Sequence, residues 1–527
     1  MRAPSMSNAD IHIPTRAEHG RSATSKSRLL RAIIFYSLIV VIALVAVPYG
    51  SVEPWWKAAF ASAVFLIGTI AFLEFYLSGR KSQLPSPSGI KGEGFSGVPE
   101  AVSSAPSSPT LLAKGEGDKG AGKSILRRHS FLLPLLALVV FGLLQTIPFG
   151  SSYSAALSRN LPRTISYDPH GTRVWATEVL ALVLLAGMLL RYTTDEKKLK
   201  ALVYIVMGAA LAAAVFGIAR QTMQHQLGFG LPYLRPGLGY AQFINKNHFA
   251  FLAEMGFGLA LGAIVWRGLP RERLVIVVGA ILILAGAVVL ANSRGGMLAV
   301  FSQMVFAGVL RLFVSPFKRH SRDEGGLNQL TRSLRASRLV HAGLMVLLVV
   351  TIALGTIWIG GAPLSASLEA VPTEVGAPSA TSRWAVRRWD IWPATLKMIK
   401  DHPIAGVGFG GYWMAITRYH NASGEMVPQE AHNDYLEFVA SGGLIALLIS
   451  AWFLYLYMQS VRARLREAPG RFVRAARCGA LVGISGVAVH SLVDFGLHVP
   501  ANAAVLVALM VISTSDLRGD KRRSRPS

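Results

Sequence analysis

The chain reads LVIVVGAILILAGAVVLANSRGGMLAV from Leu274 to Val300. Eighteen apolar residues, 274–291, precede the polar turn Asn292-Ser293-Arg294-Gly295-Gly296, and a second apolar run starts directly after it. A helix needs about 20 mostly apolar residues to cross the hydrocarbon of a bilayer. The stretch therefore predicts two membrane-spanning helices joined by a tight turn.

The composition of the whole chain agrees with a membrane protein. Of its 527 residues, 52% are hydrophobic and 15% are charged, whereas soluble proteins carry about 25% charged residues. A formal net charge of +25 would suggest nucleic acid in a soluble chain. Here the basic residues stand in short clusters between apolar runs, so we expect the lipid bilayer and no nucleic acid as a partner.

Twelve stretches are long and apolar enough to span a membrane. Lipid cannot satisfy backbone polar groups, so each stretch is expected to be helical, which makes the chain an all-α polytopic membrane protein of about twelve transmembrane helices. They run near 31–49, 58–78, 130–149, 174–190, 201–219, 247–266, 274–291, 297–314, 339–360, 434–458, 477–494 and 499–514.

The basic residues predict the orientation of these helices. Of the 53 Lys and Arg residues, 39 fall on the side of the N-terminus and 14 on the other side. Cytoplasmic loops carry the Lys/Arg excess, so both termini are expected in the cytoplasm. The polar, basic first 30 residues do not fit a cleavable signal peptide.

The same pattern divides the chain into five parts. We expect a cytoplasmic tail at 1–30, two transmembrane helices in 31–78, a flexible Gly-, Pro- and Ser-rich cytoplasmic linker at 79–128, a membrane domain at 129–515 and a basic cytoplasmic tail at 516–527. The membrane domain includes one large periplasmic loop, 361–431. The loop contains four tryptophans, and an amphipathic helix is predicted within it at 382–400.

Several cations lie on the side where the topology rule disfavours them. Such residues indicate an anionic ligand, although any one of them can instead reach lipid headgroups. Arg294 is the sharpest case, because the glycines beside it let a ligand approach the backbone and a guanidinium can clamp a phosphate. The set comprises Arg163, Arg220, Arg235, Lys246, Arg294, Arg387 and Arg388.

Three further clusters carry polar groups at the predicted outer boundary. In 244–248, Asn245 can cap the following helix, and Lys246 would sit at its positive end, where an anion is favoured. In 430–437, Asn433 or Asp434 can cap a helix, whereas His432 is not explained by capping. A histidine before a helix N-terminus is favoured in its neutral form and can act as a general base; a structural role is the plainer alternative.

The last cluster, 490–502, places Asp494, His498 and Asn502 between two membrane helices. Such groups need partners in the bundle or in a water-filled cavity, and we expect them to support the site. The sequence has one cysteine and neither a Cys/His metal set nor a nucleotide motif. We therefore expect no metal and no cofactor.

These motifs resemble the O-antigen ligase and polymerase superfamily. His432-Asn433 is followed after nine residues by Gly443, and Ser293-Arg294-Gly295-Gly296 is similar to the family's short outer turn. The stretches 388–392 and 401–410 look like its arginine-to-glycine-rich loop. The likeness covers roughly 130–515. Ala446 departs from the ligase pattern, whereas 245–250 and 494–502 are more similar to members associated with exopolysaccharide polymerisation.

The resemblance implies a GT-C-like fold and transfer of a glycan from polyprenyl diphosphate to an acceptor hydroxyl at the periplasmic face, without metal. The acceptor would be a glycan or a lipid A core. In this reading His432, Arg294 and Arg388 are catalytic. The substrate-binding residues would be Lys246, Arg220, Asn245, Asn433, Asp494 and His498.

Two other functions remain open from the sequence. The first is a transporter of lipid-linked oligosaccharide or another anion, although no repeat relates the two halves of the chain. The second is a non-catalytic assembly protein that binds polysaccharide through the tryptophans of 361–431. Sugar identity and oligomeric state leave no mark in the sequence.

Overall fold

The computed structural model describes residues 16–80, 129–154, 159–223, 239–314, 346, 388–420, 428–467 and 470–517. Its elements in chain order are α1 (Arg16–Val45), η1 (Tyr49–Ser51), α2 (Pro54–Arg80), α4 (Leu132–Leu144), β1 (Gly150–Ser154), β2 (Arg159–Arg163), α5 (Pro169–Tyr192), α6 (Glu196–Met223), α7 (Lys246–Val265), η3 (Arg271–Arg273), α8 (Leu274–Leu290), α9 (Arg294–Phe313), α11 (Arg388–Asp401), α12 (Tyr412–Ala415), η4 (Ile416–Arg418), α13 (Asp434–Arg466), α14 (Arg471–His490), η5 (Gly496–His498) and α15 (Pro500–Thr514).

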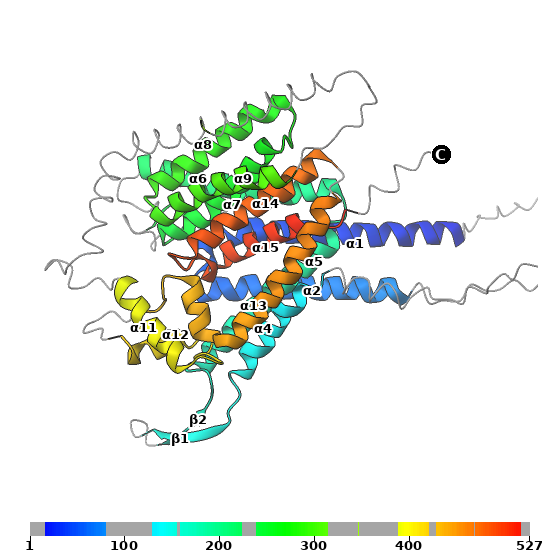
Figure 1. Cartoon of the computed structure of the whole chain (residues 1–527). Coiled ribbons are helices and arrows are strands. Elements are labelled where there is room, and N and C mark those ends of the chain that lie inside the picture. Colours follow the sequence, from blue (N-terminus) through cyan, green and yellow to red (C-terminus); the bar gives the residue numbers. More distant parts are fainter. Residues whose placement is uncertain are drawn as a thin grey trace, which may run out of the picture.

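The protein is a nearly all-helical bundle (Figure 1). Among the described residues, eight helices are long and apolar enough to cross a membrane, and α4 and α15 are shorter apolar helices. Large apolar side chains such as Val275, Ile276 and Leu448 are exposed on the outside of the bundle, which fits lipid rather than water as their surroundings. The polytopic membrane architecture is therefore supported.

The expected count of twelve spans is not confirmed by the described residues. Helix α9, predicted at 297–314, is not among the eight, and the predicted span 339–360 lies outside the described residues except for residue 346. Most of the linker 79–128, residues 361–387 of the loop and the tail beyond residue 517 also lie outside them. The predicted N-terminal tail 1–30 is helical from Arg16.

The purely helical expectation misses a small antiparallel hairpin. Strands β1 and β2 pair between α4 and α5, with Gly150 opposite Arg163 and Ser154 opposite Arg159, and the hairpin projects from the bundle in Figure 1. Residues 150–163 contain no apolar run long enough for a span. Pairing the two strands satisfies backbone groups that would otherwise need water.

Helix α14 begins six residues before the predicted span 477–494 and ends at His490. Its first turns contain arginines, which lower the hydropathy there. Arg477 is nevertheless 2% exposed, because its guanidinium donates hydrogen bonds to the carbonyl oxygens of Arg464 and Ser515. The six residues 471–476 that precede the predicted span thus belong to the helix, although two of them are arginines.

The centre of the bundle is the contact between α7 and α14. On α7, Gly258 and Gly262 are four residues apart, and they face Gly483 and Gly479 of α14. A Cβ atom at either α7 position would collide with backbone atoms of α14. Small residues at this spacing let two membrane helices approach closely, so the outer ends of α7 and α14 are held at a fixed separation.

Helix α13 is broken at Gly443, where φ is 60° and ψ is −156°. Only glycine adopts this conformation without strain. The segment 403–408 lies in the break: the amide of Leu444 donates to Pro403 O at 2.8 Å, and the amide of Val407 donates to Ala440 O at 3.0 Å. Residues 434–442 therefore form a short helix with its own direction.

The described part of the predicted periplasmic loop folds onto this short helix. The amphipathic helix predicted at 382–400 corresponds to α11, which begins at Arg388 within the described residues and contains Pro393. Met398 of α11, Tyr412 of α12 and Ala440 of α13 belong to one buried apolar cluster. The indole of Trp392 donates to Ala431 O at 3.1 Å and fixes the chain just before His432.

Candidate functional site

The turn between α14 and α15, residues 490–494, is where three other helices begin. Gly295, in the first turn of α9, packs against the imidazole of His490. The amide of Asp434, the first residue of α13, donates to the carbonyl oxygens of Ser491 and Asp494 at 3.0 and 3.2 Å. The side chain of Asn247, in the first turn of α7, donates to the Asp494 carboxylate. The sequence motifs of all four segments therefore meet at one end of the bundle.

His432 lies beside the carboxylate of Asp494. The two atoms His432 Nδ1 and Asp494 Oδ1 are 3.7 Å apart, and the edge of the imidazole meets the Phe495 ring with centroids 4.8 Å apart. Asp494 is 1% exposed, whereas the His432 side chain is 35% exposed. A buried carboxylate next to an accessible imidazole is an arrangement that can orient a general base.

The backbone of His432 is in the left-handed region, with φ of 50°. Such a conformation costs energy in a residue with a side chain and is found most often at functional sites. Asn433 holds it there, because its side chain caps α13 by accepting from the amides of Tyr435 and Leu436, each at 3.0 Å. Asn433 thus has a structural role that the sequence offered as one of two choices.

Arg294 is the first residue of α9 and is half-buried. Ser293 caps this helix by accepting from the amide of Gly296 at 3.2 Å, and Asn292 before it has φ of 51°. The predicted turn therefore exists and places Arg294 at a helix N-terminus, where the helix dipole and free amides favour anions.

Of the other predicted cations, Arg220 and Lys246 lie at the ends of α6 and α7 and Arg163 ends β2, whereas Arg235 and Arg387 lie outside the described residues. Arg220, which is 8% exposed, donates to Ala241 O at 2.7 Å and ties the segment before α7 to α6. Asn245 caps α7 by accepting from the amide of Asn247 at 2.9 Å, and Lys246 follows as the first helical residue. Arg388 begins α11, and its side chain is outside the described residues.

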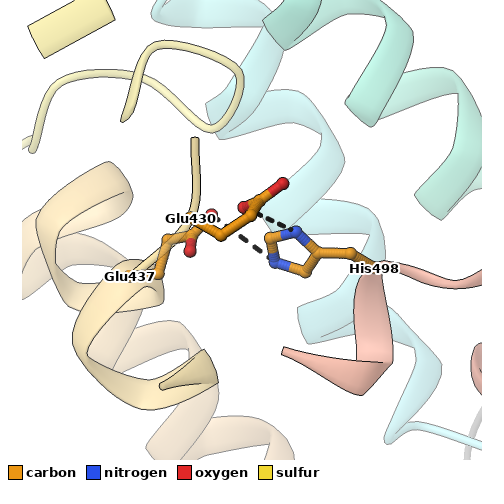
Figure 2. Close-up of side chains that lie close together, drawn as sticks. All are labelled: Glu430, Glu437 and His498. Atoms are coloured by element: carbon orange, nitrogen blue, oxygen red, sulfur yellow. Dashed lines mark ion pairs between the residues drawn. The ribbon is translucent and has the colours of Figure 1, made fainter. Parts of the chain in front are cut away.

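His498 belongs to a second cluster, which Figure 2 shows. Its Nδ1 atom lies 3.2 Å from Glu430 Oε2, and its Nε2 atom lies 3.6 Å from Glu437 Oε1 and 3.7 Å from Asp434 Oδ1. Glu437 also accepts from the amide of Ala431 at 2.8 Å. Glu437, in the first turn of α13, therefore reaches back to the residue before His432 and helps to fix it.

The charges in this cluster shift one another's protonation. Burial opposes the imidazolium, but the carboxylates of Glu437 and Glu430 outweigh it and raise the pKa of His498 to about 10. Burial likewise opposes ionisation of Glu430, yet the charge and hydrogen bond of His498 lower the pKa of that carboxyl well below its usual range. The pair is thus ionised at neutral pH.

Glu430, Glu437 and His498 are close enough to one another to bind a metal ion. The ligand atoms of Glu430, Glu437 and His498 lie within 4.8 Å of one another. The imidazolium stands between the two carboxylates and offsets part of their negative charge, so ion pairs alone account for the spacing. The prediction of a metal-independent site stays a prediction.

Sequence reasoning did not identify two groups of residues. Glu430 and Glu437 were seen only as part of a helix start, because their partner His498 is about sixty residues away in the chain. The pair His490 Nδ1 and Glu254 Oε2, 3.0 Å apart and fully buried, was also missed. A glutamate inside the span 247–266 was the available signal, since intramembrane charges need a named partner.

A comparison with protein families matches the middle of the chain. A family model described as O-antigen ligase matches residues 279–451, and no curated protein matches the chain. The matched segment contains Arg294, Arg388, His432 and Gly443, and it ends before Asp494 and His498. Residues 279–451 of this multi-pass membrane protein are therefore similar to the O-antigen ligase family, and the match covers about a third of the chain.

Proposed function

We propose that the protein transfers a glycan from polyprenyl diphosphate to an acceptor hydroxyl at the periplasmic face of the bacterial inner membrane. The observation that carries this proposal is the juxtaposition at the 490–494 turn. An accessible imidazole, His432, lies next to a buried carboxylate, Asp494, while the N-terminus of α9 with Arg294 packs on the same turn. A proton acceptor and an anion site are thus neighbours.

The chemistry that follows is a single displacement. The acceptor hydroxyl gives its proton to His432 as its oxygen forms a bond to the anomeric carbon of the donor glycan. The bond between that carbon and the diphosphate oxygen breaks, and the diphosphate leaves with the electron pair. The anomeric configuration inverts, since retention would require a covalent intermediate on a protein nucleophile.

The cations have separate tasks in this scheme. Arg294 and Arg388 stabilise the charge that develops on the leaving diphosphate, and Lys246 adds a further positive charge at the start of α7. Loss of one electrostatic donor of this kind typically lowers an enzyme's rate by about 10²- to 10³-fold. Arg220 acts indirectly through its bond to Ala241, which holds the segment before α7. Asn245 and Asn433 hold their helix starts in place.

The test is product formation by variants in membranes supplied with donor and acceptor. His432→Ala should lower the rate by about 10²-fold or more, and Arg294→Ala by about 10²-fold, with partial recovery in Arg294→Lys, which keeps the charge but not the fork geometry. Lys397→Ala removes an exposed cation of α11 and should change nothing. Full activity in both His432→Ala and Arg294→Ala would refute the mechanism.

Deletion of the chromosomal copy separates the two kinds of transfer. Loss of long surface polymer with normal lipopolysaccharide would mark a polymerase, and an uncapped lipid A core would mark a ligase. Reconstituted protein with both substrates on one side of the membrane distinguishes a transferase from a transporter, because only a transferase forms product there. An assembly protein would bind glycan and leave product formation unchanged when His432 is lost.

A further inference from the structure

A cavity of about 230 Å³ opens where α2, α5, α13 and α15 begin. Its floor and walls come from segments far apart in the chain, including Lys57 of α2, Trp175 of α5, Trp413 of α12, Glu437 of α13 and Ala503 of α15. The proposed transfer mechanism uses neither the cavity nor the aromatic side chains around it.

One wall of the cavity is aromatic and rigid. Trp175 and Phe409 stack with ring centroids 3.9 Å apart and an interplanar angle of 7°. Trp413 is 44% exposed, and its indole is fixed by a hydrogen bond of 3.2 Å to the carboxylate of Asp168. Flat aromatic faces of this kind offer large contact area at low entropic cost, and they suit the apolar C–H face of a sugar ring.

The lining of the cavity also carries hydrogen-bonding groups. The carboxylates of Glu430 and Glu437 line it together with His498, and Lys57 pairs with Glu178 at 3.3 Å. Carboxylate oxygens accept hydrogen bonds from hydroxyl groups. The charged groups of the lining are three carboxylates, one lysine and one imidazolium, which leaves a net negative charge: Glu178, Glu430, Glu437, Lys57 and His498. A negative charge repels a phosphate, so the cavity favours a hydroxylated ligand over the diphosphate of the donor.

The cavity adjoins the proposed proton acceptor. Glu430 stands two residues before His432 in the chain, and the Phe495 ring contacts both imidazoles, with centroids 4.8 Å from His432 and 6.0 Å from His498. The anion site at Arg294 packs on the 490–494 turn instead. Anion site, base and cavity therefore follow one another along this end of the bundle.

We propose that this cavity binds one sugar unit of the acceptor glycan, next to the unit whose hydroxyl meets His432. The proposal rests on the proposed function, because it takes His432 as the point of transfer. It assigns Trp413 and the stacked pair of Trp175 and Phe409 to the sugar face, and Glu430 and Glu437 to the hydroxyls.

The test measures glycan binding apart from transfer. Full-length protein in lipid nanodiscs is examined by saturation-transfer difference NMR with two probes: short oligosaccharides cut from the host's surface polysaccharide and the core oligosaccharide of its lipopolysaccharide. Wild-type protein should bind one of them. Ala503→Phe, which fills the cavity, and Trp413→Ala, which removes an aromatic face, should each weaken binding roughly tenfold.

Two matched variants complete the design. Leu506→Phe enlarges a half-buried side chain one turn further along α15 that does not line the cavity, and it should bind within twofold of wild type. His432→Ala should bind normally while transfer is lost. Thermal melting of each variant shows that it is folded.

Three results would overturn the inference: no binding of either probe by wild type, unchanged binding in both Ala503→Phe and Trp413→Ala, or displacement of the bound oligosaccharide by polyprenyl phosphate, which would make the occupant a lipid. Transfer that persists in His432→Ala would instead refute the proposed mechanism. It would leave cavity-dependent binding intact, so the two failures are distinguishable.

Discussion

Replacing Gly443 by alanine tests whether the break in α13 is obligatory. At φ of 60° and ψ of −156°, a residue with a side chain is strained by about 1–3 kcal/mol. The new Cβ atom would also stand 2.5 Å from the carbonyl carbon and oxygen of Ile404 and 2.8 Å from the amide nitrogen of Ala405. These are backbone atoms, which cannot move away as a flexible side chain can.

The magnitude follows from what must shift. Four hydrogen bonds join segment 403–408 to α13 around the break: Leu444 N to Pro403 O, Ile445 N to Ile404 O, Val407 N to Ala440 O and Gly408 N to Ser441 O. Each is worth about 1 kcal/mol net. Strain plus loss of even two of these bonds gives a destabilisation of about 3–5 kcal/mol, well above the roughly 1 kcal/mol typical of point mutations.

The assay is thermal unfolding of the purified protein in detergent, with transfer activity measured alongside it. Gly279→Ala is the matched control, because a Cβ atom at that position of α8 meets nothing within 4 Å and alanine favours the helix. Gly443→Ala should melt clearly below wild type, and Gly279→Ala at or above it. Equal melting of the two variants would show that the break imposes no strain and would refute this reasoning.

Two other perturbations address the polar groups. Asp494→Asn keeps the shape of the side chain and a hydrogen-bonding oxygen but removes the charge beside His432. It should lower kcat by about 10- to 10²-fold and leave KM for the donor unchanged. A change in KM alone would instead show that Asp494 has a binding role. Because the pKa of His498 is raised from 6.5 to about 10, its ion pairs stabilise the fold fully below pH 6.5, and this stability is lost as the pH rises towards about 10. Melting temperatures measured between pH 6 and 10 should fall more steeply for wild type than for His498→Gln, and parallel curves would contradict the ion-pair assignment.

Helices that are apolar along their whole length were predicted most accurately. The run 274–291 is apolar throughout, and it corresponds to α8, Leu274–Leu290. Helix α14 begins earlier than predicted because residues 471–476 are helical, and their two arginines led the hydropathy pattern to leave them out of the span. The hairpin between α4 and α5 was missed because its strands are only five residues each and show no clear apolar alternation.

The sequence indicated the individual motifs of the candidate site, but it did not indicate which of them contact one another. The motifs around Arg294, Lys246, His432 and Asp494 were found from the types and positions of their residues. Their meeting at the 490–494 turn could not be read from the sequence, because it depends on how α7, α9, α13 and α14 pack. The same limit hid the ion pairs of His498, whose partners are distant in the chain.

The close contact of α7 and α14 has a consequence for how substrates enter. Gly258 packs against Gly483 and Gly262 against Gly479, so a sideways shift of either helix would bring backbone atoms into collision. Asn247 and Asp494, near the ends of the two helices, therefore have a fixed relative position. The short helix 434–442 is instead joined to the rest of α13 through a single glycine pivot. Its first residue is also tied to the 490–494 turn, because the amide of Asp434 donates to Ser491 O and Asp494 O. His432 and Asp494 therefore keep their alignment, and the substrate of the proposed reaction has to adapt to a preformed pair.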